Sequence, residues 1–291
     1  MQIIDNSNIM KRIHPSSHKN RGLLILAVFI AFGFNATAQY KENTEIGLLG
    51  GVSYYLGDLN TTHFFQPSPA GGLVVRKNID NRFSYKAEAL YLTLQSDERD
   101  SKDTIAADRG LHFMSTVIEL SGQLEFNFLP YEIGNPLYTW TPFNYVGVSL
   151  FHHNPQAENE DGEWIDLQPL GTEGQGTTLF SDRKEYSLIQ FAIAMGGGVK
   201  VAVNESFNII FEYGCRKTFT DYLDDVSTTF VGGNGGPYPI EMTQEAIEMS
   251  DPLTTHSKDI QRGNPDKKDW YSFVGVTLSF KLNNNTKDCD Y

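Results

Sequence analysis

The stretch that most constrains the fold is Asp269 to Leu282, DWYSFVGVTLSFKL, because its residues alternate between two faces. A period of two over this length predicts a β-strand with one apolar side. Trp270 and Phe280 bracket an aliphatic centre, which is typical of a strand that crosses a bilayer between two aromatic girdles. The apolar face carries Trp270, Val274, Val276, Leu278, Phe280 and Leu282, and the other face carries Tyr271, Gly275, Thr277, Ser279 and Lys281.

The composition is that of a folded domain with an acidic surface. Of 291 residues, 40% are hydrophobic and 12% aromatic, which excludes a disordered polyelectrolyte. The net charge of −13 argues against nucleic-acid binding, which needs a basic face.

The first 38 residues have the pattern of a signal peptide. A basic region precedes an apolar core, Gly22 to Phe34, which is too short to span a bilayer as a mature helix. Ala36-Thr37-Ala38 is an A-x-A cleavage site, so we expect a signal peptide over 1–38 and a mature chain over 39–291. The alternative is a retained N-terminal anchor helix. No later run of 18 apolar residues occurs, which leaves a soluble exported protein or a β-barrel.

Seven further segments show strand periodicity, and the connections between them alternate in length. The strands are expected near 44–57, 70–78, 82–95, 112–129, 142–152, 185–203 and 207–219, with the triple glycine Gly196–Gly198 marking a bulge or bend. Short links at 79–81, 130–141 and 204–206 alternate with long ones at 58–69, 96–111, 153–184 and 220–268. Short periplasmic turns and long extracellular loops alternate in this way in outer-membrane barrels.

The pattern therefore predicts an all-β fold, a single-chain antiparallel transmembrane β-barrel of eight strands (OmpA-like) with both termini in the periplasm. Ten strands, with a hairpin hidden in 220–268, is the alternative count. The two cysteines would lie at opposite ends of such a barrel, so we expect no disulfide between Cys215 and Cys289.

Charged residues on the polar faces of these strands would point into the barrel. An eight-stranded barrel is just wide enough for side chains to fill it, so the charges must pair with one another. We expect a hydrogen-bonded ionic plug, and the alternative is a proton or ion path. The predicted lumen residues are Arg76, Lys86, Glu88, Glu119, Glu125, Glu212, Arg216 and Lys281.

No motif in the chain predicts catalysis, a cofactor or a metal. His152 and His153 are adjacent, and neighbours on a strand face opposite sides, so they do not form a natural chelating pair. No nucleophile elbow or other ordered catalytic signature occurs. We therefore predict no catalytic, cofactor-binding or metal-binding residue.

One long loop has a composition that indicates a fixed backbone shape. Three glycines and a proline lie within 166–176, DLQPLGTEGQG. The loop either folds over the barrel mouth or forms a docking surface. The residues of this loop motif are Asp166, Gln168, Pro169, Gly171, Thr172, Glu173, Gly174, Gln175 and Gly176.

Several stretches resemble the PorG-like outer-membrane barrel family of Bacteroidota. They are EIGLLGGVSYYLGDL (45–59), PFNYVGVSLFHHNPQA (142–157), WIDLQPLGTEGQG (164–176), FTDYLDDVSTTFV (219–231) and RGNPDKKDWYSFVGVTLSFKL (262–282). The resemblance implies a non-catalytic outer-membrane component of the type IX (Por) secretion system, which also supports gliding motility in some species. It further implies association with the periplasmic ring of the lipoprotein PorK and of PorN.

The resemblance leaves two alternatives from other functional classes. One is a small-solute channel or surface-binding barrel, and the other is an outer-membrane enzyme that acts on lipid. Besides the ring proteins, the expected partners are outer-membrane lipid and the barrel assembly machinery, which would read Gly275 to Phe280 of the last strand. For the ring contact, the longest periplasmic turn is favoured over the shorter turns and the tail 283–291. Its candidate contact residues are Tyr131, Pro136, Tyr138 and Trp140.

Overall fold

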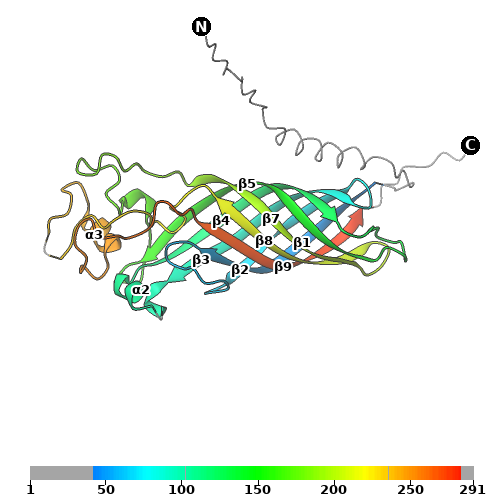
Figure 1. The fold of residues 1–291 in the computed structure, drawn as a ribbon, viewed down its shortest axis with the longest axis horizontal. Coiled ribbons are helices and arrows are strands. Elements are labelled where there is room, and N and C mark those ends of the chain that lie inside the picture. Colours follow the sequence, from blue (N-terminus) through cyan, green and yellow to red (C-terminus); the bar gives the residue numbers. More distant parts are fainter. Residues whose placement is uncertain (1–41, 102, 235, 283–291) are drawn as a thin grey trace, which may run out of the picture. The chain divides into compact units, whose positions relative to one another are not determined.

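Eight long strands form a closed antiparallel ring in the computed structural model (Figure 1). The structure describes residues 42–101, 103–234 and 236–282, so the predicted signal peptide 1–38, the tail 283–291 and Cys289 lie outside the described residues. The ring strands are β1 (Asn43–Leu56), β2 (Ser68–Asn78), β3 (Phe83–Asp97), β4 (His112–Asn127), β5 (Trp140–Glu158), β7 (Ile189–Ala202), β8 (Phe207–Thr218) and β9 (Trp270–Leu282).

Each ring strand pairs with its neighbours in the sequence, and the ring closes between the first strand and the last. β9 pairs with β1 from Leu282 opposite Thr44 to Trp270 opposite Leu56, and its other edge pairs with β8. β4 and β5 are also paired, so no free edge remains in the ring. The predicted eight-stranded antiparallel barrel and its closing strand are confirmed.

The long connections gather at one end of the barrel and the short turns at the other (Figure 1). The long connections carry η1 (Glu98–Asp100), α2 (Thr104–Arg109), β6 (Trp164–Asp166), η2 (Gln168–Leu170) and α3 (Gln244–Ser250). β6 only extends the far end of β5 as a hairpin. Within the described part of 219–269 there is no hidden strand pair of the ring, so eight strands and not ten make the wall. No helix among the described residues is long and apolar enough to cross a membrane.

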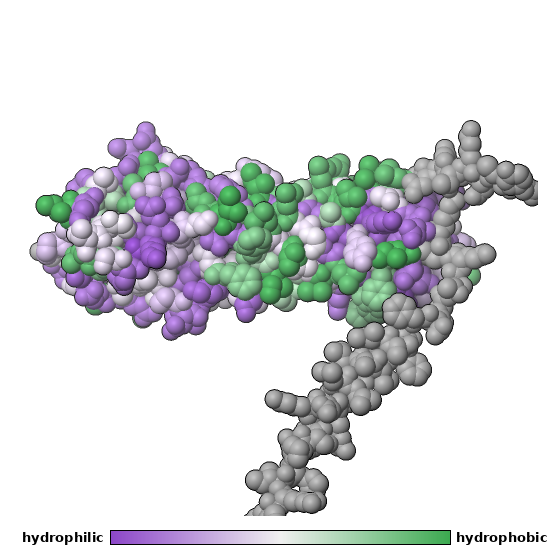
Figure 2. Space-filling view, turned by 90° about the horizontal axis from the view of Figure 1, so that it is seen from above, coloured by the Kyte–Doolittle hydropathy of each residue, from purple (hydrophilic) through white to green (hydrophobic). Residues whose placement is uncertain are grey.

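The outward face of the wall is an apolar belt to which all eight strands contribute. Figure 2 shows hydrophobic side chains of this belt on one side of the barrel. Because side chains alternate along a strand, every second residue of β4 from Ile118 to Phe126 faces outward. Gly122 is in this series but has no side chain. Representative belt residues are Ile46, Leu48, Leu73, Val75, Tyr85, Tyr91, Ile118, Leu120, Val148, Phe191, Phe211, Leu278 and Phe280, which are between 44% and 67% exposed. A wall of this kind is matched to lipid rather than to water.

Aromatic rings border the belt toward the short turns. Phe83 is paired in register with Phe126, and Phe207 with Phe280; the ring centroids are 5.3 and 4.9 Å apart. Trp270 lies ten residues from Phe280 on β9. Ten strand residues span about 33 Å, and a tilt of about 40° reduces this to about 25 Å along the barrel axis. That height matches the apolar band of a membrane barrel.

The triple glycine does not form the predicted bulge. The β5–β7 and β7–β8 pairings run through Gly196, Gly197 and Gly198 without an inserted residue. Gly196 and Gly214 instead leave room for the Tyr145 ring, since a Cβ atom would lie 2.6 Å from the tyrosine hydroxyl at Gly196 and 2.0 Å from it at Gly214. The bulge prediction is wrong because the strand pairing continues through all three glycines, and Gly196 leaves space for a neighbouring ring.

The belt predicts an asymmetric response to an exposed charge. Leu120 lies mid-belt on β4 and is 61% exposed, whereas Ile105 lies on α2 and is 75% exposed. We expect Leu120→Arg to lower the free energy of unfolding by about 2–4 kcal/mol in lipid vesicles, because arginine near the bilayer midplane is costly. Ile105→Arg is expected to change it by less than about 0.5 kcal/mol. Equal effects in urea titrations of the two variants would contradict a lipid-facing belt.

Candidate functional site: the barrel interior and its two ends

Nine ionisable side chains are buried in the barrel interior, from the end nearer the short turns to the row of Arg216 and Tyr271. All are at most 3% exposed, and five are carboxylates while four are cations, so the set is nearly neutral. Because removing a charge from water is costly, such a set is stable only when each member is paired. This ionic core consists of Glu45, Arg76, Lys86, Glu88, Glu119, Glu125, Lys200, Glu212 and Arg216.

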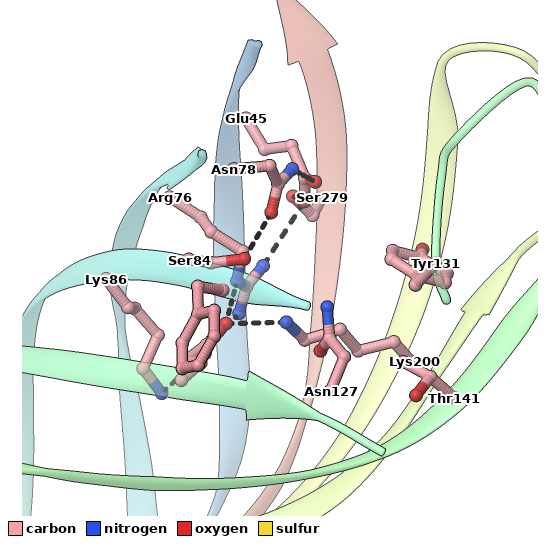
Figure 3. A network of polar contacts seen from close by, with 12 residues as sticks. Glu45, Arg76, Asn78, Ser84, Lys86, Asn127, Tyr131, Thr141, Lys200 and Ser279 are labelled. Carbon is pink, nitrogen blue, oxygen red and sulfur yellow. Dashed lines mark hydrogen bonds and ion pairs between the residues drawn. The ribbon is translucent and has the colours of Figure 1, made fainter. Parts of the chain in front are cut away.

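Glu125 on β4 is the point where three cations converge. Its Oε2 accepts hydrogen bonds from Arg76 Nε at 2.7 Å and from Lys200 Nζ at 2.6 Å. The Lys86 ammonium lies 3.9 Å from its other oxygen. Figure 3 shows Arg76, Lys86 and Lys200 reaching into this region from three different strands. One carboxylate on β4 thereby holds cations from β2, β3 and β7.

Lys86 and Arg216 carry the network toward the middle of the barrel. Lys86 Nζ contacts both oxygens of Glu212 at 2.8 Å and Glu88 Oε2 at 3.0 Å. Arg216 Nη2 donates to Glu88 at 2.7 Å and its Nε donates to Glu119 at 3.1 Å. Each of these two cations therefore bridges two carboxylates from different strands.

Glu45 closes the network beside the β1–β9 seam. It lies 3.2 Å from Arg76 and accepts hydrogen bonds from Asn208 and Ser279, each at 3.0 Å. Asn78 also donates to it. Figure 3 shows Glu45, Arg76 and Ser279 close together. The seam that closes the ring is thus held by side chains as well as by backbone pairing.

The structure brings together seven of the eight predicted lumen residues and leaves Lys281 apart. Lys281 is partly exposed at the end of β9, where its Nζ donates to the Ile133 carbonyl at 3.2 Å. Lys200 and Glu45 belong to the ionic core but were not among the predicted residues. Lys200 follows the triple glycine, and a bulge there would have turned it outward. Continuing the alternation of Ala192 and Ala194 without a bulge points it inward.

An apolar core fills the interior toward the loops. Phe113, Phe151 and Phe273 are at most 2% exposed and pack with Tyr271 and Leu92 in one cluster. Phe273 occupies the space beside Gly275, where a Cβ atom would lie 2.2 Å from its ring. The Tyr271 hydroxyl donates to Glu119 at 2.7 Å and so joins this layer to the ionic core. The interior is consequently mainly ionic toward the short turns, where Phe143, Tyr145 and Ile210 pack among the charges, and apolar toward the loops.

The turn 128–139 covers the barrel end nearest the ionic core. Tyr131 is 2% exposed, and its hydroxyl accepts a hydrogen bond from Asn208 at 3.0 Å. The prediction that Tyr131 contacts a partner is therefore wrong, because its side chain faces into the barrel. Pro136, Tyr138 and Trp140 are exposed, the last two at 37% and 52%.

The loop motif 166–176 folds over the opposite end of the barrel. Glu173 is fully buried and accepts hydrogen bonds from Ser227 N, Thr228 N and Thr228 Oγ1, the last at 2.6 Å. Its carboxylate also pairs with Arg262 at 3.1 Å. Buried residues of the motif are Gly171, Thr172, Glu173, Gly174 and Gln175, Gln168 is partly buried, and Asp166, Pro169 and Gly176 are exposed. The burial of these residues agrees with the first alternative for this loop, that it folds over the barrel mouth.

Beneath these loops lies a cluster of buried acids around Tyr55. The Tyr55 hydroxyl is 2.5 Å from Asp224 and 3.1 Å from Asp269. A phenol has one proton to donate, so it serves one carboxylate at a time and the other is favoured in its protonated form. Burial raises the pKa of both aspartates well above the usual range, and it raises the pKa of nearby Asp221 to about 7.

Histidine, cysteine and acidic side chains do not form a metal site among the described residues. His152 is exposed, and His153 is buried against Tyr186 with the ring centroids 6.1 Å apart. The two histidines thus point to opposite sides of β5, as strand alternation requires. Cys215 is a free thiol on β8.

One family model matches this chain over residues 21–169, just over half of its length, and the family is described as a domain of unknown function, DUF6089. The chain belongs to the DUF6089 family. No curated protein matches the sequence.

Solved structures similar to this DUF6089 barrel are outer-membrane proteins. The N-terminal β-barrel domain of Pseudomonas aeruginosa OprF is 10% identical with a TM-score of 0.33, and the match covers 82% of this chain and 100% of that one. A major outer membrane protein from Thermus thermophilus is 8% identical with a TM-score of 0.40, covering 84% and 100%. OprG from Pseudomonas aeruginosa is 13% identical with a TM-score of 0.39, covering 84% and 97%.

The convergence of three cations on Glu125 predicts a large cost for removing its charge. We expect Glu125→Gln to lower the free energy of unfolding by about 3–5 kcal/mol, because Arg76 and Lys200 then remain buried without their shared partner. Urea unfolding in lipid vesicles measures this change in the free energy of unfolding. Glu42→Gln is the matched control, since the Glu42–Lys77 pair is exposed and is expected to contribute less than about 1 kcal/mol. Similar losses in both variants would contradict the role of Glu125.

The buried acids predict that the loops over the barrel lose stability as pH rises. The pKa is raised to about 7 at Asp221 and to about 6 at Asp225, against about 4 in unfolded chains. The folded loops therefore hold protons that the unfolded loops release between about pH 4 and pH 7, so stability falls across this window. Amide hydrogen exchange in 219–269, corrected for intrinsic rates, should show more frequent opening at about pH 8 than at about pH 5.

A matched pair of neutralising variants separates this effect from a general charge effect. Asp221→Asn should reduce the difference in exchange between the two pH values, because one of the groups that titrate is gone. Asp182→Asn, at an exposed loop position, should leave it unchanged. Equal protection of the wild-type loops at the two pH values would show that the buried acids do not couple folding to pH.

Proposed function

We propose that this DUF6089 barrel is a non-catalytic protein of the cell outer membrane that serves the type IX protein secretion system. In this role it anchors or aligns the periplasmic ring of PorK and PorN. The observation that carries the membrane part is the continuous apolar belt around a closed ring of strands. The resemblance of 164–176 and 219–231 to PorG-like barrels supports the secretion part.

The filled interior supports an anchor over a conduit or a solute channel. A polypeptide or solute would have to displace the ionic core, whose charges bridge β1, β2, β3, β4, β7 and β8. It would then meet the apolar core around Phe113 and Phe273. Both layers are part of what holds the barrel together, so the barrel contributes a position in the membrane and not a path across it.

The face nearest the short turns is the natural site for a periplasmic partner. The turn 128–139 and the start of β5 expose Leu137 at 81%, Tyr138 at 37% and Trp140 at 52%. Exposed aromatic and aliphatic side chains of this kind are typical anchors of protein interfaces. Tyr131 and Ile133 hold the turn from inside, which gives these side chains a fixed platform.

Deletion of the gene is expected to abolish export of cargo that carries C-terminal sorting domains. A photo-crosslinking residue at Tyr138 in the complemented strain should yield adducts with PorK or PorN. The same residue at Ile240, which is 95% exposed on the opposite end, should yield none. Normal export in the deletion strain would refute the secretion role, and ring adducts from Ile240 but not Tyr138 would refute the assigned face.

A further inference from the structure

A groove of about 430 Å³ lies on the outside of the barrel where β1, β8 and β9 end at the loops. Three lysines line it, Lys217 from β8 and Lys267 and Lys268 from the connection to β9. Trp270 and Leu56 form its apolar wall, and all three lysines are exposed. This lysine groove has one exposed acid in its lining, Asp266.

The strand register places the groove directly beyond the apolar belt. Leu56, Trp270 and Lys217 are neighbours in one row across β1, β9 and β8. They lie on the face that carries belt residues such as Phe280 and Leu278 further along β9. The row of Trp270 is about 25 Å along the barrel axis from the row of Phe280, which is the distance between the two borders of an apolar band.

The three lysines form no salt bridge with the described residues. Among the described residues, none of the three ammonium groups has a carboxylate within 4.0 Å. Lys268 donates to the Pro265 carbonyl at 2.8 Å, and Lys217 lies 5.6 Å from the centre of the Trp270 ring. Asp58 attracts Lys267, and Asp221 attracts Lys268, without direct contact. The two carboxylates accept their hydrogen bonds from other groups, Asn264 N and Ser227 Oγ. The net charge of the chain is −13, so a local cluster of three lysines without salt bridges stands out from the rest of the surface. Its positive potential attracts an external anion.

The connection 57–67 supplies a flank that suits a lipid. His63 lines the groove and shares a hydrogen bond with Tyr54 at 3.0 Å, which folds the connection down onto the outer wall. Phe64 packs on Tyr54 with the ring centroids 4.8 Å apart and remains 56% exposed. Aromatic side chains at this height are favoured at the boundary between acyl chains and head groups.

We propose that the lysine groove binds the phosphate group of a phosphorylated lipid in the outer leaflet. The lipid's acyl chains would lie along the belt below Trp270, and its phosphate would be held by Lys217, Lys267 and Lys268. The proposal rests on the membrane location given under the proposed function. A lipid is favoured over a free anion because the cationic groove and the apolar belt share one face of the wall.

The test uses the purified full-length barrel in detergent and measures binding of diphosphoryl lipid A by native mass spectrometry. Each lysine near a membrane surface is worth about a five-fold change in affinity. Lys217→Ala, Lys267→Ala and Lys268→Ala combined should therefore weaken binding by about 100-fold. The corresponding arginine variant should retain binding. Dephosphorylated lipid A should bind the wild type weakly, with the affinity that the alanine variant has for diphosphoryl lipid A. Inorganic phosphate should compete only weakly with the lipid.

The matched control removes three exposed lysines elsewhere, by Lys77→Ala, Lys184→Ala and Lys258→Ala, and should bind as the wild type does. Loss of binding in this control, equal binding by the alanine variant, or equal binding of both lipid forms would overturn the proposal. A gel-shift between unheated and heated samples reports whether each variant forms the barrel. If the wild type is folded and inserts into membranes but binds neither lipid, lipid binding by the groove is refuted and the proposed function is not. If the wild type fails to insert, the proposed function is refuted as well.

Discussion

The rest of the structure depends on the mutual neutralisation of charges inside a closed ring. Eight strands enclose a space just wide enough for side chains, and water cannot solvate what points inward. Glu125, held by Arg76 and Lys200, and Arg216, held by Glu88 and Glu119, meet that constraint. These pairs join strands that are not adjacent in the wall. The network therefore fixes the cross-section of the barrel as well as its contents.

The other features follow from the same ring. Alternation along each strand sends Leu120 and Phe280 outward when it sends Glu119 and Ser279 inward, so the lipid-facing belt and the ionic core have one origin. Toward the loops the interior becomes apolar, and the loops cover it through the pairing of Glu173 with a buried arginine. The result is a body that is closed at both ends. Such a body suits a protein that holds a position in a membrane.

Periodicity was sufficient to predict the fold and most of the interior. The polar residues of 112–129 alternate so regularly that Glu119 could be placed inside from the sequence. Lys200 could not be placed inside from the sequence, because the triple glycine before it has two physical interpretations. It marks either a bend or space for a neighbouring ring. At the ends of the barrel, periodicity says nothing about how a connection folds back. The sequence therefore did not predict the burial of Tyr131 beneath its turn. For 166–176 it left open whether the loop folds over the barrel, and it did not predict the partners of Glu173 in 219–231.

Because its interior is filled with side chains, we expect the barrel not to conduct ions. Single-channel recording of the purified wild-type protein in planar bilayers tests it most directly, with insertion verified separately by protease protection of the belt strands. The two-layered interior predicts no stepwise conductance at neutral pH, because both the ionic core and the apolar core exclude hydrated ions. Stable, reproducible conductance steps from inserted wild-type protein would contradict the account.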